Sequence, residues 1–364
     1  MSKVAVLGDD RGLIGRVLRG RELRQVSPPR WGIKNHPVDL LAALSRPRAE
    51  WQADFVRRQI KRSGGKIILT LIDNVEYLGY CSDPNYGIRT IAIQNGLRLP
   101  DTEWRYSIDR FRSIKNRNEF QHDIYLAWGE WDVERYLKLG GSARQIVSVG
   151  SLPDALHRAK SNSALQNHLI GALEIREPRG LFFDLLPFPP RNPQIMSAYA
   201  NNIRILYSYL ERYCKTEAIE PLFVLNSTHE LAPQLDLLAD LYPSARKIHH
   251  DLTNTLASYD GVASCHVVVG VQSSLLVEVF GRGRKILAFN PSGNEDLNFP
   301  IDGIWSLSDG RYEAFAERLR MILEMSPSAW ESHVGVASKR LIAYDPHAPT
   351  DAVIRELVSD LMVR

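Results

Sequence analysis

The 364-residue sequence has few of the features that mark several common protein classes. Its three cysteines, Cys81, Cys214 and Cys265, lie far apart without a CxxC pair, which argues against a disulfide framework and against a zinc site. No segment approaches the ~20 apolar residues that span a bilayer. The net charge of +3 is too small to indicate a nucleic-acid partner. The opening MSKVAVLGDD enters a strand pattern directly, so we expect no signal peptide and a cytoplasmic protein with reduced thiols.

Familiar catalytic motifs are missing as well. The chain contains no Walker A sequence, no HExxH and no GxSxG. Gly8, Gly12 and Gly15 follow the first strand pattern, but their spacing is wrong for a dinucleotide fingerprint. No DxD pair stands out as a metal site. The sequence therefore predicts neither a P-loop enzyme nor a metal-dependent one.

Strand and helix patterns alternate along almost the whole chain, which is typical of α/β layers with parallel sheets. The length favours two domains. Residues 152–179 are polar and helical with no strand pattern, which suits a linker, and strands resume at residues 180–186. We predict a first domain over residues 1–155, a second over residues 156–345, and a C-terminal helix within residues 346–364 that packs back on the first domain.

The most informative segment is HVVVGVQSSLLVEVFGRGRKILAFNP, residues 266–291. It predicts a buried strand, a tight turn, a helix and a second strand. Ser273 and Ser274 stand where their hydroxyls can cap the helix, and Glu278 follows on the same side. A helix N-terminus behind a parallel strand suits a phosphate, and a carboxylate one turn further can accept hydrogen bonds from a ribose. An ordinary βαβ unit with an exposed Glu would show the same pattern.

This segment, together with IQNG at residues 93–96 and WGEW…VGS within residues 128–151, resembles glycosyltransferases of the GT-B fold. The likeness is to bacterial enzymes that build surface carbohydrates. It implies two Rossmann-like domains with a cleft between them. It further implies transfer of a sugar from a nucleotide-sugar donor to a glycan or lipid-linked acceptor of polysaccharide or lipopolysaccharide. Such enzymes usually need no bound metal and no cofactor, because a helix N-terminus and basic side chains stabilise the leaving phosphate.

The resemblance implies roles for individual residues. The expected donor-binding residues are Gln272, Ser273, Ser274, Glu278, Arg191 and His250. Residues at strand ends of the first half should face the acceptor, namely Asp73, Asn74, Gln94 and Asn95. For catalysis we favour Asp184, with His229 or Glu230 as its partner. Many related enzymes have His-Pro where this chain has His229-Glu230, and the sequence leaves both inverting and retaining transfer open.

The donor and the exact reaction also stay open. A CMP-linked acid sugar is one candidate donor, because some transferases with a similar Ser-Ser helix use one; UDP- and GDP-sugars are others. Transfer of a polyol phosphate from a CDP-alcohol, a nucleotide-sugar 2-epimerase and a non-catalytic GT-B-like binding protein are alternative functions.

Basic residues are concentrated in residues 11–62 and 105–117. They indicate either solvated helix faces or attraction to an anionic membrane surface or lipid-linked acceptor, which would place the protein at the inner membrane.

Overall fold

The structure is a computed structural model. It describes residues 4–7, 12–26, 48–71, 78, 81, 87–97, 121–138, 141–159, 166–173, 193–225, 246–249 and 255–363. The chain divides into two compact units. The first comprises Met1–Gly96, Trp104–Leu156 and Leu341–Arg364, and the second Leu97–Glu103 and His157–Arg340.

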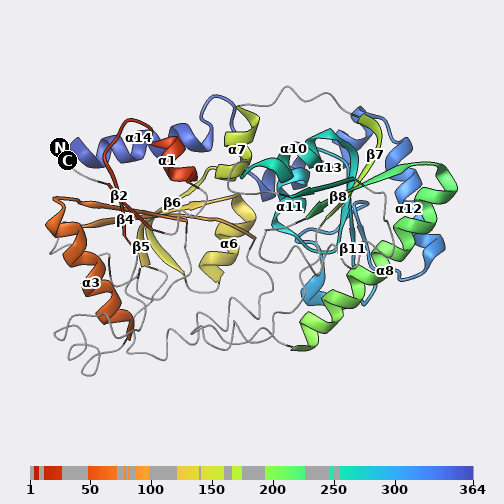
Figure 1. Cartoon of the computed structure of the whole chain (residues 1–364), viewed down its shortest axis with the longest axis horizontal. Coiled ribbons are helices and arrows are strands. Elements are labelled where there is room, and N and C mark those ends of the chain that lie inside the picture. Colours follow the sequence, from red (N-terminus) through yellow and green to blue (C-terminus); the bar gives the residue numbers. More distant parts are fainter. Residues whose placement is uncertain are drawn as a thin grey trace. The chain divides into compact units, whose positions relative to one another are not determined.

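The first unit contains a six-stranded sheet of order β2-β1-β3-β4-β5-β6, in which neighbouring strands are parallel. Helices α3 and α6 lie on one face of this sheet, and α1 and α14 on the other (Figure 1). Ala53, Val56 and Ile60 of α3 belong to one buried hydrophobic cluster with side chains of strands β1 and β3. The elements are β1 (Val4–Leu7), α1 (Leu13–Val17), β2 (Leu23–Gln25), α3 (Arg48–Arg62), β3 (Ile67–Thr70), β4 (Arg89–Ile93), β5 (Gln121–Ala127), α6 (Glu130–Lys138), β6 (Ser142–Ser148), α7 (Leu152–Arg158) and α14 (Thr350–Val363).

The second unit contains another six-stranded sheet, of order β12-β11-β10-β7-β8-β9, again with parallel pairs. The strand order reverses between β7 and β10, and in open α/β sheets ligands bind at the carboxyl ends of strands beside such a reversal. The elements are β7 (Gln166–Leu173), α8 (Pro193–Glu217), β8 (Glu220–Leu225), β9 (Arg246–His249), α10 (Ala257–Ser264), β10 (Cys265–Gly270), α11 (Ser274–Gly281), β11 (Ile286–Phe289), η3 (Glu295–Leu297), β12 (Ser306–Leu307), α12 (Tyr312–Glu324) and α13 (Pro327–Leu341).

Two sequence-based expectations are wrong. Residues 152–179 are not a strand-free linker, because β7 lies within them and pairs with both β8 and β10. Its Gly171 allows a close approach, since a Cβ there would lie 2.9 Å from the Cys265 sulfur. The polar residues around this eight-residue strand obscured its hydrophobic pattern in the sequence. The sequence reading also missed α13, which lies between α12 and α14.

The last segment of the chain belongs to the first unit. The Ala343 N–H donates to the Trp128 carbonyl over 2.8 Å, and the Thr350 hydroxyl donates to the Val149 carbonyl. Gly150 has φ +83° and lies so close to Ala343 that a Cβ would meet its carbonyl oxygen at 3.0 Å. The VGS turn at residues 149–151 therefore has a structural role, because it packs against the C-terminal segment of the chain.

Burial makes two of the cysteines poor nucleophiles. Cys81, Cys214 and Cys265 are all free and buried. Desolvation raises the pKa of the Cys81 and Cys214 thiols to about 12. Because the thiolate is the reactive form, we expect these thiols to be inert at neutral pH.

His122 predicts how the stability of the protein depends on pH. Burial lowers the pKa of its imidazole from 6.5 to about 4, although nearby Asp123 opposes the shift. The unfolded chain therefore binds the proton more readily than the folded chain. The contribution of neutral His122 to the free energy of unfolding is fully present above pH 6.5 and is lost as the pH falls toward 4. The expected loss is about 3 kcal/mol. Urea unfolding between pH 7 and 4 should show a flatter pH dependence for His122→Gln than for the unsubstituted chain, and parallel curves would contradict this assignment.

Candidate functional site

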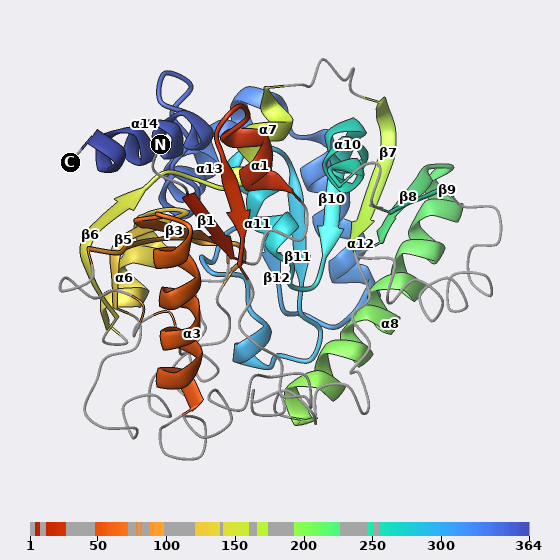
Figure 2. The same cartoon turned by 60° about the vertical axis from the view of Figure 1, so that its left-hand side comes forward.

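The N-terminus of α11 is capped as its sequence predicts. Ser273 has extended backbone angles, φ −149° and ψ 142°, and its hydroxyl accepts a hydrogen bond from the Leu275 N–H over 3.2 Å. The helix starts directly beyond the carboxyl end of β10 (Figure 2). Helix N-termini carry partial positive charge and point N–H groups outward, so this one is suited to an anion such as phosphate.

Glu278 lies one turn into α11 and is almost fully buried, with 3% of its surface exposed. Both of its carboxylate oxygens lie 2.9 Å from the hydroxyl of Tyr259, on α10. The structure therefore shows a carboxylate held in a fixed orientation, not the exposed side chain of an ordinary surface helix.

A second polar network lies beside this pair. The guanidinium Nη1 of Arg282 lies 3.1 Å from Nδ1 of His157, and Nε2 of His157 lies 2.9 Å from Oδ1 of Asp260. A guanidinium only donates, so Nδ1 is the acceptor and the neutral Nε2–H tautomer donates to Asp260. The His157 ring and the Arg282 guanidinium both pack near the Tyr259 ring, at 5.8 Å in each case. The network thus supports the tyrosine that holds Glu278.

On its other side, the start of α11 is tied to the loop that follows β11. The Gln272 side-chain amide donates to the Asp296 carbonyl over 2.9 Å. Asn290 organises this loop: its amide nitrogen donates to the Asn294 carbonyl at 2.8 Å and to Oδ1 of Asn298 at 2.7 Å. Its oxygen in turn accepts from the fully buried Asn202 at 2.8 Å. Amide contacts therefore fix the loop relative to the sheet.

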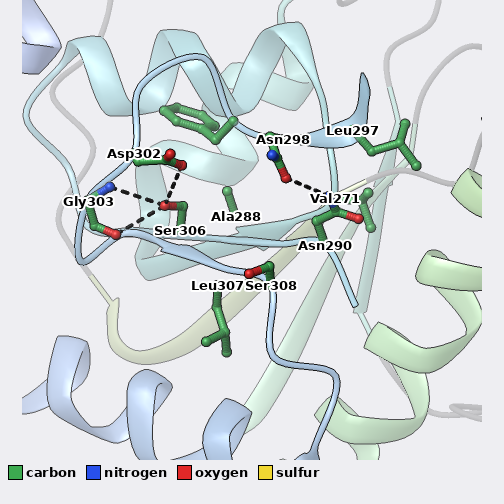
Figure 3. Close-up of a pocket in the computed structure, with 11 residues that line it drawn as sticks. Val271, Ala288, Asn290, Leu297, Asn298, Asp302, Gly303, Ser306, Leu307 and Ser308 are labelled. Carbon is green, nitrogen blue, oxygen red and sulfur yellow. Dashed lines mark hydrogen bonds between the residues drawn. The ribbon is translucent and has the colours of Figure 1, made fainter. Parts of the chain in front are cut away.

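Beneath this loop lies a pocket of about 280 Å³ (Figure 3). Its residues come from the carboxyl ends of β10, β11 and β12 and from the connection between the last two strands. The lining consists of Val271, Ala288, Asn290, Leu297, Asn298, Phe299, Asp302, Gly303, Ser306, Leu307 and Ser308. The exposed surface of this lining is mainly polar, with a smaller apolar part.

The structure brings together four of the predicted donor-binding residues. Gln272, Ser273, Ser274 and Glu278 all lie at or just inside the start of α11. The Ser274 hydroxyl accepts a hydrogen bond from the Leu97 N–H over 3.0 Å, within the second unit. The other predicted donor-binding and catalytic residues lie outside the described part of the chain: Arg191, His250, Asp184, His229 and Glu230.

The expected acceptor-side residues belong to the first unit. Gln94 is fully buried, and its side chain accepts from the Trp128 N–H at 2.9 Å and donates to the Gly96 carbonyl at 3.2 Å. Its amide is thus engaged in holding the turn, whereas Asn95 beside it is exposed. Asp73 and Asn74 lie outside the described residues.

Sequence reasoning missed the residues that support Glu278. Tyr259 and His157 stand in segments where they look like ordinary helix residues, so no local signal marks them. Arg282 follows Glu278 by four positions, a spacing that places two residues on one helix face and could have pointed to it. Asn202 lies within a long amphipathic helix and gave no signal.

The two Rossmann-like units define a GT-B fold, and solved structures share it. HepE of Anabaena in complex with UDP-glucose is 11% identical with a TM-score of 0.52, covering 99% of this chain and 100% of that one. The UDP-GlcNAc 2-epimerase of Neisseria meningitidis bound to UDP-GlcNAc is 12% identical with a TM-score of 0.55, covering 100% of both chains. The UDP-GlcNAc 2-epimerase of Methanocaldococcus jannaschii, in complex with UDP-GlcNAc and UDP, is 10% identical with a TM-score of 0.53 over 99% of both. At these identities the likeness establishes the fold alone.

A family model described as "putative O-antigen biosynthesis protein" matches residues 91–351. The match covers well over half of the chain, so the protein belongs to this family. The search of curated protein sequences found no match to this chain.

The described residues offer neither a membrane span nor a metal cluster. No helix among them is both long enough and apolar enough to cross a bilayer. In the same part of the chain, no group of three or more His, Cys, Asp and Glu side chains is placed to hold a metal ion.

Proposed function

We propose that the protein is a glycosyltransferase of bacterial surface polysaccharide synthesis that takes its sugar from a UDP-linked donor. The observation that carries the proposal is the start of α11, where a capped helix N-terminus stands one turn from the buried, oriented carboxylate of Glu278. This spacing suits a nucleoside diphosphate, with the diphosphate at the helix N-terminus and the ribose hydroxyls at Glu278. Family membership in O-antigen biosynthesis supports the biological setting.

The neighbouring structures favour uridine over cytidine. HepE and the two epimerases are bound to UDP or a UDP-sugar, and none of the three complexes contains a CMP-linked sugar. UDP would act as the leaving group. The partial positive charge of the α11 N-terminus would stabilise the negative charge that develops on the departing diphosphate.

The acceptor hydroxyl and the base complete the proposal. Transfer with inversion needs a group that removes the proton of the attacking hydroxyl. We retain Asp184 for this role, with His229 or Glu230 as its partner, and Asp73, Asn74 and Asn95 as acceptor-side residues. The acceptor would be a glycan or a lipid-linked sugar.

Calorimetric titration with UDP, CMP, CDP and GDP tests the donor class, and we expect UDP to bind most tightly. Product analysis with UDP-glucose and UDP-GlcNAc then tests the reaction. A transferase releases UDP and, without its natural acceptor, passes the sugar slowly to water. Conversion to an epimer without UDP release would identify an epimerase instead. Tightest binding of CDP together with cleavage of a CDP-alcohol would identify a polyol-phosphate transferase, and no response to any nucleotide would favour a binding protein.

A further inference from the structure

We infer that the 280 Å³ pocket of the second unit holds the sugar of the donor and selects an uncharged sugar over an acidic one. The inference rests on the proposed function, because it takes the α11 N-terminus as the diphosphate site. It adds the class of sugar, which neither the family nor the fold defines.

The position of the pocket follows from the strand register. Gly270 of β10 pairs with Ala288 of β11, and Ala288 pairs with Ser306 of β12. These residues therefore share one face of the sheet, whereas the neighbouring Phe289 packs on the opposite face against Phe315 of α12. The pocket begins at Val271, two residues before the helix cap Ser273. A group attached to a diphosphate at the cap would thus lie next to the pocket.

The lining matches the two kinds of surface on a sugar ring. Val271, Leu297 and Phe299 offer apolar contacts suited to ring C–H groups. Amide, hydroxyl and carboxylate groups offer hydrogen bonds to ring hydroxyls, from Asn298, Asp302, Ser306 and Ser308. Among the described lining residues there is no lysine, arginine or histidine to neutralise an anion.

Asn298 is oriented by its neighbour. Its Oδ1 accepts from Asn290 Nδ2 over 2.7 Å, so its own Nδ2 group is left as the donor, with no partner among the described residues. Asn290 is fixed in turn by the buried Asn202. A donor amide held by a chain of buried amides is a preorganised contact for a hydroxyl oxygen.

Asp302 carries the selectivity. Figure 3 shows its carboxylate across Ala288 from the Asn290–Asn298 pair, with the Ser306 hydroxyl 3.5 Å from Oδ1. The carboxylate can accept hydrogen bonds from two sugar hydroxyls, which are stronger than bonds to neutral acceptors. It would repel the carboxylate of a uronic or other acid sugar, and the described lining offers no cation in compensation. An uncharged hexose or N-acetylhexosamine therefore fits the pocket chemically, and an acidic sugar does not.

The test is to titrate the full-length protein with UDP, UDP-glucose, UDP-GlcNAc and UDP-glucuronate. We expect at least one of the two uncharged donors to bind about tenfold or more tightly than UDP-glucuronate. Asp302→Asn should reduce that preference to about threefold or less and leave the affinity for UDP itself unchanged. Because Asp302 is exposed, the substitution should not disturb folding. Glu295→Gln, which removes another exposed carboxylate from the same loop without touching the lining, is the matched control and should change nothing.

The outcomes separate the two ideas. If UDP binds but the unsubstituted protein does not favour uncharged donors, or Asp302→Asn leaves the preference intact, the assignment of the sugar pocket is overturned and the nucleotide site stands. If UDP fails to bind at all, the proposed function fails and the pocket assignment falls with it. Tighter binding of UDP-glucuronate than of both uncharged donors would also overturn the inference.

Discussion

Replacing Glu278 by Gln is expected to weaken UDP binding by about 10- to 100-fold, since hydrogen bonds to a charged group contribute about 1.5–3 kcal/mol. The substitution keeps the shape of the side chain and removes its charge. The carboxylate is 3% exposed and oriented by the Tyr259 hydroxyl, so the ribose would meet a group already in place. A neutral amide would replace one of the acceptor oxygens by a donor and so lose at least one ribose contact.

Isothermal titration with UDP measures this loss, and thermal unfolding shows whether the variant is folded. Saturation at 100 times the dissociation constant should stabilise the unsubstituted protein by about 2.7 kcal/mol, and this increment should shrink in Glu278→Gln. Glu317→Gln, on the exposed side of α12 in the same unit, is the control and should bind UDP normally. A folded Glu278→Gln protein with unchanged UDP affinity would remove the carboxylate from the donor site and with it the main support for the proposed function.

Tyr259→Phe refines the same result. The ring stays, so its packing near His157 and Arg282 is retained, and only the hydroxyl that orients Glu278 is lost. A loss of UDP affinity smaller than that of Glu278→Gln is therefore expected. A larger loss would instead make the phenol itself a direct contact of the nucleotide.

The parts of the site that the sequence predicted are local ones. A run of valines, two serines and a glutamate one turn later lie within twelve consecutive residues, and backbone geometry alone brings them together. The helix cap at Ser273 follows from the preference of serine for that position. Parallel α/β architecture was equally accessible, because alternating strand and helix patterns extend through most of the chain.

The parts that sequence reasoning missed depend on contacts between distant segments. Tyr259 reaches Glu278 from another helix, and His157 meets Arg282 across 125 positions of the chain. Pairings of this kind depend on strand order, which the hydrophobic pattern does not encode. β7 was missed for a related reason: it is a central strand whose neighbours β8 and β10 are distant in sequence.

Phe280→Ala is expected to destabilise the protein by about 3–5 kcal/mol, the usual cost of emptying a large buried aromatic site. Phe280 is fully buried, two residues beyond Glu278 on α11. Its ring meets Phe299 edge-on at 5.3 Å and Trp305 at 4.7 Å, so it joins the helix to the segment that walls the pocket. The two remaining rings, Phe299 and Trp305, cannot fill a cavity of this size without moving α11, and this is why the expected loss lies at the high end for core substitutions.

Urea unfolding measures the loss, and Val336→Ala serves as the control. Val336 is 86% exposed, so its truncation should change stability by less than about 0.5 kcal/mol.

The same urea unfolding in the presence of UDP tests whether the packing also positions the site. If the aromatic cluster fixes α11, Phe280→Ala should both lower the unfolding midpoint and reduce the stabilisation that UDP confers. A loss below about 1 kcal/mol would show that the ring contributes little packing. A large loss with full stabilisation by UDP would show that the nucleotide site is held by the polar contacts of Tyr259 and Gln272 and not by the hydrophobic core beneath the helix.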